Sequence, residues 1–99
     1  MKLNFNQPIL TLDEKPLVNA DGSSVTMAYA AKEALLAIFP TEKEISGDEK
    51  FKRYQLAKKI NSSSEECEIS IEEAALIKKL VSMAYGANVV GRLYEMMEK

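Results

Sequence analysis

Residues 70–85 read SIEEAALIKKLVSMAY, and this stretch decides the fold class. Ser70 and Glu73 have the spacing of a capping box, in which each side chain satisfies a backbone N–H of the other residue at a helix start. From Ile71 to Tyr85 the apolar residues recur at helical spacing over a wide arc, and the polar residues fill one narrow strip. Such a helix needs covering on several sides. We therefore predict a helix over residues 71–85 in the middle of the core.

Two helices are predicted upstream of it. The first runs over residues 27–39, is capped by Ser24 or Thr26, and stops at Pro40. Three alanines on one of its faces allow a neighbouring helix to approach closely, and apolar residues on other faces indicate neighbours on both sides. The second upstream helix begins at the capping-box spacing of Ser46 to Glu49 and runs to residue 60.

One helix is predicted downstream, over residues 89–98. Asn88 is its candidate cap, and Gly86 is the candidate residue that ends the preceding helix. The predicted bundle therefore has three or four helices.

The first 25 residues favour extended structure with two turns. Leu3 and Phe5 alternate with polar residues, and turn signals occur at residues 13–16 and 19–22. An isolated hairpin is marginal in water, so this unit must pack on the helices or pair with another segment; a short extended piece is expected at residues 67–69. The predicted fold class is α+β, mainly α, with a short N-terminal β-hairpin on a helical bundle. We predict one domain over residues 1–99, divided into an extended part (1–25) and a helical part (26–99).

Composition narrows the function. The chain has 99 residues, a net charge of −2, no histidine and one cysteine. The absence of histidine removes the commonest general base, the usual zinc sites and every histidine-dependent triad. No glycine-rich phosphate loop occurs, and no nucleophile and base pair stands out. We therefore predict a protein without catalytic activity, metal or cofactor.

The compartment is predicted from the same features. A single cysteine, Cys67, cannot form a disulfide within the chain, which fits a reducing environment. Met1 is not followed by an apolar segment of the signal-peptide kind, and no run of about 18 apolar residues occurs. We expect a cytoplasmic protein without a membrane segment, in which Cys67 is a structural residue.

Two charged clusters leave alternatives open. Five glutamates between residues 65 and 73 could form a solvated helix start, an anionic docking patch or a hard-cation site. Lys52, Arg53, Lys58 and Lys59 lie on the predicted second helix, interleaved with aromatic residues. These basic residues could be a solvated face, contact an anionic partner, or bind nucleic acid through phosphate pairing and base stacking.

The apolar residues exceed what a domain of this size needs for its interior. The last helix carries a Met- and Tyr-rich face, and such residues either close the core or form an interface. On the first predicted helix, Tyr29 and Leu36 project away from the alanine face. The candidate interface residues are Tyr29, Leu36, Leu93, Tyr94, Met96 and Met97.

Three segments resemble small accessory proteins encoded by tailed phages and prophages. They are KLNFNQPILTLDEKPLVNADGSSVT at residues 2–26, SGDEKFKRYQLAKKI at 46–60 and VSMAYGANVVGRLYEMMEK at 81–99. The resemblance implies an accessory protein made in a bacterial cytoplasm that binds and redirects a host or phage protein. It implies no catalytic residue.

The function predicted from these observations is a non-enzymatic protein-binding or self-associating module, expected to form a homo-oligomer. The alternative is a small nucleic-acid-associated regulator that uses the basic helix at residues 49–60. Nucleic acid is the less favoured partner because the net charge is negative.

Overall fold

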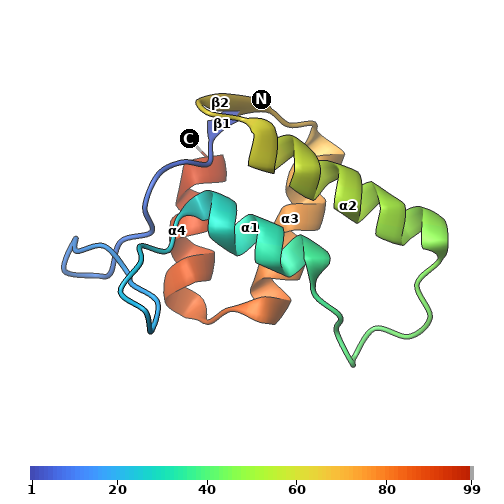
Figure 1. Cartoon of the computed structure of the whole chain (residues 1–99), viewed down its shortest axis with the longest axis horizontal. Coiled ribbons are helices and arrows are strands. Elements are labelled where there is room, and N and C mark those ends of the chain that lie inside the picture. Colours follow the sequence, from blue (N-terminus) through green and yellow to red (C-terminus); the bar gives the residue numbers. More distant parts are fainter. Residues whose placement is uncertain (99) are drawn as a thin grey trace.

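The computed structural model describes residues 1–98 (Figure 1). The elements in chain order are β1 (Lys2–Asn4), α1 (Met27–Leu36), α2 (Gly47–Ser62), β2 (Glu66–Glu68), α3 (Ile71–Ala84) and α4 (Ala87–Met97). The predicted fold class is confirmed: the protein is α+β, mainly α, with short antiparallel β pairing at its N-terminus. Across residues 1–98, no helix is both long and apolar enough to cross a membrane.

Helix α3 begins where the sequence predicts. The Ser70 hydroxyl accepts a hydrogen bond from Glu73 N at 3.0 Å, and the Glu73 carboxylate accepts one from Ser70 N at 2.9 Å. The capping box is therefore complete. Helix α3 packs against both α1 and α4, and α1 also packs against α2. The two predicted neighbours of α1 are thus α2 and α3, as Figure 1 shows.

The N-terminal segment is fastened to the chain between α2 and α3. Strand β1 pairs antiparallel with β2, with Leu3 opposite Cys67. The Met1 ammonium group and Ile69 O lie 2.9 Å apart, and Ile69 N donates back to Met1 O at 2.7 Å. Asn6 adds two hydrogen bonds from its side-chain amide to Ser63 O and Ser64 O. The expectation that the extended unit pairs with another segment is therefore confirmed.

Two tight turns follow β1. Glu14 N donates to Thr11 O, and eight residues later Gly22 N donates to Asn19 O. Both donors have a positive φ, 63° at Glu14 and 87° at Gly22. The turns bring three extended residues together in a closed ring of 2.8 Å hydrogen bonds: Ile9 N to Val25 O, Val25 N to Leu17 O and Leu17 N to Ile9 O. This ring satisfies backbone groups without a regular sheet.

Three helix boundaries differ from the prediction by two or more residues. Helix α2 ends at Ser62 rather than at residue 60. Helix α1 ends at Leu36 rather than at residue 39; Ala37 is extended, and residues 38 and 39 belong to no helix or strand. Pro40 disfavours helical geometry in the residue before it. Helix α4 begins at residue 87 with Gly86 as its N-cap. Asn88 therefore does not cap α4, and its side chain donates instead to Leu10 O.

Helix α4 also clamps the N-terminal segment. The Arg92 guanidinium donates to Leu10 O at 3.0 Å and to Thr11 O at 2.7 Å.

The hydrophobic core contains buried side chains from every helix and from the N-terminal segment. Its largest fully buried side chains are Phe5, Ile9, Ile60, Cys67, Ile69, Ile77, Leu80, Val81 and Leu93.

Candidate protein-binding surface

Large apolar side chains remain exposed along the groove between α1 and α2. Leu36 ends α1 with 58 % of its surface exposed, and Ile38, in the segment after it, is 94 % exposed. On α2, Tyr54 is 51 % exposed and lines the smaller of the two hollows described below. Phe51 is 57 % exposed and stacks on Tyr54 at a centroid distance of 6.3 Å, but it lines a separate hollow on another side of α2. We call Leu36, Ile38 and Tyr54 the groove residues.

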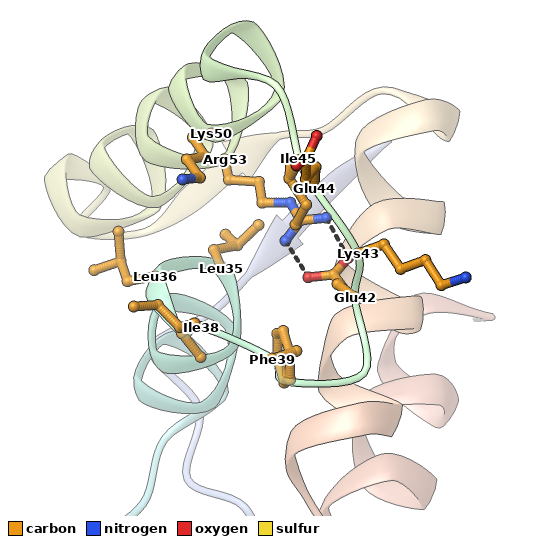
Figure 2. A pocket seen from close by; sticks show the side chains of 11 residues that line it. Leu35, Leu36, Ile38, Phe39, Glu42, Lys43, Glu44, Ile45, Lys50 and Arg53 are labelled. Atoms are coloured by element: carbon orange, nitrogen blue, oxygen red, sulfur yellow. Dashed lines mark hydrogen bonds and ion pairs between the residues drawn. The ribbon is translucent and has the colours of Figure 1, made fainter.

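Two hollows lie along this groove. The larger has a volume of about 500 Å³ and lies inside the bend formed by the end of α1, the connector 37–46 and the start of α2. The smaller, of about 380 Å³, lies between the middle of α1 and the second half of α2. Leu36 lines both hollows, so they adjoin. Figure 2 shows the larger one, with Leu36, Ile38 and Phe39 on one side and the Arg53–Glu42 pair on the other.

A buried ion pair fixes the connector. Arg53 is 6 % exposed, and among residues 1–98 no other charged residue is buried. Its two terminal nitrogens donate to the two carboxylate oxygens of Glu42 at 2.9 and 2.8 Å, and its Nε donates to Glu49 at 3.2 Å. The hydrogen bond from Arg53 holds the pKa of the Glu42 carboxyl below its ordinary value. The pairing ties the connector to α2.

The predicted interface residues separate into three groups. Leu36 and Tyr29 are exposed on α1, and their interface role stays a prediction. Leu93 and Met97 are instead buried, because they lie four residues apart on the face of α4 that covers the core. For these two residues the interface prediction is wrong, and the alternative, closure of the core, holds.

The other two predicted interface residues of α4 are partly covered. Met96 packs against the core. Tyr94 lies beneath Lys78, whose Nζ is 5.0 Å from the ring centroid, and Lys78 also pairs with Glu98 at 2.7 Å. Tyr94 on α4 and Glu98 at the end of α4 are thus both linked to Lys78 of α3 within the chain.

The predicted basic cluster is not assembled as one surface. Arg53 is buried with its two carboxylates, and Lys59 pairs with Glu73 at 3.2 Å. Lys52 and Lys58 remain exposed, but Lys52 lines the hollow between α2 and α3, whereas Lys58 lies on the side of α2 that faces α1.

The acidic cluster is dispersed as well. Glu73 belongs to the capping box, and Glu68 lies 3.9 Å from the terminal ammonium group. Nowhere in the described part of the chain do three or more histidine, cysteine or carboxylate side chains gather as a metal site would require. Cys67 is buried in β2, which agrees with the structural role predicted for it.

Sequence reasoning missed two of the three groove residues. Ile38 would share the alanine face of α1 if the helix continued to residue 39, and it leaves that face because the helix ends two residues earlier. Tyr54 is one of the aromatic residues interleaved with the predicted basic cluster, and the sequence alone does not show that it lies beside α1. Two features of the sequence could have indicated these residues: the three-residue spacing of Phe51 and Tyr54, which places their side chains next to one another on a helix, and Pro40, which ends the preceding helix early.

Comparison with known proteins identifies no relative of this chain. No protein-family model, no curated protein and no solved structure matches this chain.

Proposed function

We propose that this protein is a small non-enzymatic binding module that holds another protein molecule in the groove between α1 and α2. The observation that carries the proposal is the exposure of Leu36, Ile38 and Tyr54 beside two adjoining hollows. Exposed apolar side chains gathered at a concave surface are typical of interaction sites. Aromatic residues at the centre of such a surface contribute most to binding energy.

The fixed connector supports this proposal. Binding costs less free energy when the receiving surface is already ordered, because fewer backbone conformations are lost. The Arg53–Glu42 pair orders the wall of the larger hollow before any partner arrives. A buried ion pair contributes little net stability to a fold, so its value here is the conformation that it fixes.

The phage-type accessory role belongs to the same proposal. The likeness of residues 2–26, 46–60 and 81–99 to small accessory proteins of tailed phages and prophages agrees with a protein that acts by contact in a bacterial cytoplasm. The nucleic-acid alternative is less well supported, since Arg53 and Lys59 are already paired within the chain.

Photo-crosslinking tests the proposal. A benzoylphenylalanine at position 38, in a lysate of cells that produce the protein, should give one discrete cross-linked product. Excess unlabelled protein should abolish this product, and the Leu36→Asp variant should fail to do so. The matched control is Ile71→Asp, because Ile71 is an exposed isoleucine at the start of α3, outside both hollows. If no product forms, or if the two variants compete equally, the proposal is wrong.

A further inference from the structure

Three lysines frame the apolar centre of the groove. On α2, Lys50, Tyr54 and Lys58 follow one another at four-residue spacing and therefore form one row along the helix. On α1, Lys32 precedes Leu36 by the same spacing. Lys50 lines the larger hollow, and the other four residues line the smaller one.

These lysines are not neutralised within the protein. As far as the structure describes the chain, Lys50 and Lys58 form no ion pair, and Lys32 donates to the neutral amide oxygen of Asn61 at 2.9 Å. The smaller hollow is lined by one carboxylate, Glu33, against two lysines. In the larger hollow, Lys43 and Glu44 direct their charged ends away from the centre (Figure 2). The groove is therefore cationic, although the chain as a whole carries a charge of −2.

The walls of the groove suit a helical ligand. Backbone groups inside α1 and α2 are bonded within each helix, so the two helical walls present only side chains to a ligand. The non-helical connector 37–46 lines only the larger hollow. A ligand helix presents its own side chains at matching intervals. Lys50 and Lys58 are about 12 Å apart along the α2 axis, which corresponds to two carboxylates eight residues apart on a helix lying alongside.

A second copy of the chain fits this groove poorly. A two-fold dimer through the groove would bring the cationic surface of one copy against the same cationic surface of the other. Like charges brought together across an interface oppose association. Nucleic acid would explain the lysines but leave the aliphatic surface of Leu36 and Ile38 unused.

From this geometry we infer that the partner is a protein that inserts an acidic amphipathic helix, with apolar anchors between two carboxylates about two turns apart. The inference rests on the proposed function and adds the chemistry of the partner. The carboxylates pair with Lys50 and Lys58, and the apolar anchors lie against Leu36, Ile38 and Tyr54.

Fluorescence anisotropy with synthetic helices tests the inference. One labelled helical peptide carries two glutamates eight residues apart with leucines between them on the same face; a second peptide replaces both glutamates with lysine. We expect the protein to bind the first peptide and not the second. Lys50→Glu and Lys58→Glu should each weaken binding roughly fivefold at low salt, and less at high salt. Lys52→Glu is the matched control, since it makes the same charge change on the other flank of α2.

The outcomes separate the inference from the function on which it rests. If the acidic peptide fails to bind, or if Lys52→Glu weakens it as much as Lys58→Glu, the acidic-helix inference is wrong. If both peptides bind equally and Leu36→Asp abolishes both, the groove is a binding surface and only the acidic partner is wrong. If Leu36→Asp and Tyr54→Asp leave peptide binding unchanged, the proposed function fails as well. A single-stranded oligonucleotide that binds more tightly than the acidic peptide, with Lys58→Glu weakening it, also overturns the inference.

Discussion

Glu14 occupies a backbone conformation that suits glycine better. Its φ of 63° lies in the left-handed region, where a side chain costs about 1–2 kcal/mol. Gly22, eight residues later, has the equivalent place in the second turn and carries no such cost. Glu14 receives only a long hydrogen bond of 3.4 Å from Arg92 in compensation. The first turn is therefore held by its surroundings rather than by its own sequence.

Substitutions at Glu14 and at Gly22 should change the free energy of unfolding in opposite directions. Glu14→Gly should raise the free energy of unfolding by about 0.5 kcal/mol, because the strain that it removes exceeds the added freedom of the unfolded chain. Gly22→Ala should lower it by about 1 kcal/mol. Urea denaturation measures both changes. A loss of stability in Glu14→Gly would show that the contact with Arg92 matters more than the backbone strain.

The ion pair between Arg53 and Glu42 predicts that the free energy of unfolding depends on pH. The pKa of Glu42 is lower in the folded protein than its ordinary value of 4.5, chiefly because of the hydrogen bond from Arg53. Such a carboxyl stabilises the fold above pH 4.5 and loses this contribution as the pH falls through its folded pKa. Arg53→Met removes the partner and leaves the Glu42 carboxylate enclosed. We expect the variant to have a lower free energy of unfolding than the wild type at neutral pH.

Denaturation curves between pH 3 and pH 7 measure this effect. The difference in unfolding free energy between wild type and Arg53→Met should shrink below pH 4.5, because protonation then removes the charge that Arg53 compensates. The carboxyls of Glu73 and Glu98 also have lowered pKa values, but both proteins retain them, so their contributions cancel. A difference that stays constant with pH would contradict the role given to the ion pair.

At the scale of elements, α1 and α4 each bury some of their apolar side chains in the core and leave others outside it. On α4, Leu93 points into the core, and the partly buried Tyr94 is covered by Lys78. On α1, the alanine face packs inside while Leu36 remains in solvent. The sequence of α1 is apolar on more than one side and that of α4 has one broad apolar face, and the packing of α3 against both helices decided which residues are covered.

Two leucine-to-alanine substitutions distinguish these faces. Leu93→Ala should lower the free energy of unfolding by about 3 kcal/mol, because it leaves a cavity in the core. Leu36→Ala should change it by less than about 0.5 kcal/mol, since the side chain is largely exposed. Thermal and chemical unfolding measure both. Equal effects would mean that Leu36 is packed within the chain and is unavailable to a partner.

At the scale of the whole molecule, the pairing of β1 with β2 joins the N-terminal segment to the chain between α2 and α3. Cys67 is 2 % exposed and lies opposite Leu3 in this two-stranded pairing, so its thiol reports on whether the N-terminal segment stays attached. The pairing depends on few contacts, among them the two hydrogen bonds from Asn6 to the end of α2.

Thiol labelling measures the attachment. Cys67 in the native protein should react slowly with a disulfide reagent, and Asn6→Ala should speed the reaction roughly tenfold by making local opening easier. Asn19→Ala is the control, because Asn19 bonds only within its own turn. If Asn6→Ala leaves the rate unchanged, opening at Cys67 proceeds by another route.

The sequence by itself determined the helical elements, the capping of α2 and α3, and the extended, two-turn character of the first 25 residues. These are local properties, because capping hydrogen bonds, turn residues and helical periodicity act over a few positions along the chain. Only the tertiary structure decided that β1 pairs with β2, that Arg53 turns inward, and that Leu93 is covered while Ile38 is not. Each of these depends on which distant segment lies alongside, and an amphipathic pattern shows that a face needs covering without showing what covers it. The groove between α1 and α2 is one apolar surface that remains after those pairings are made.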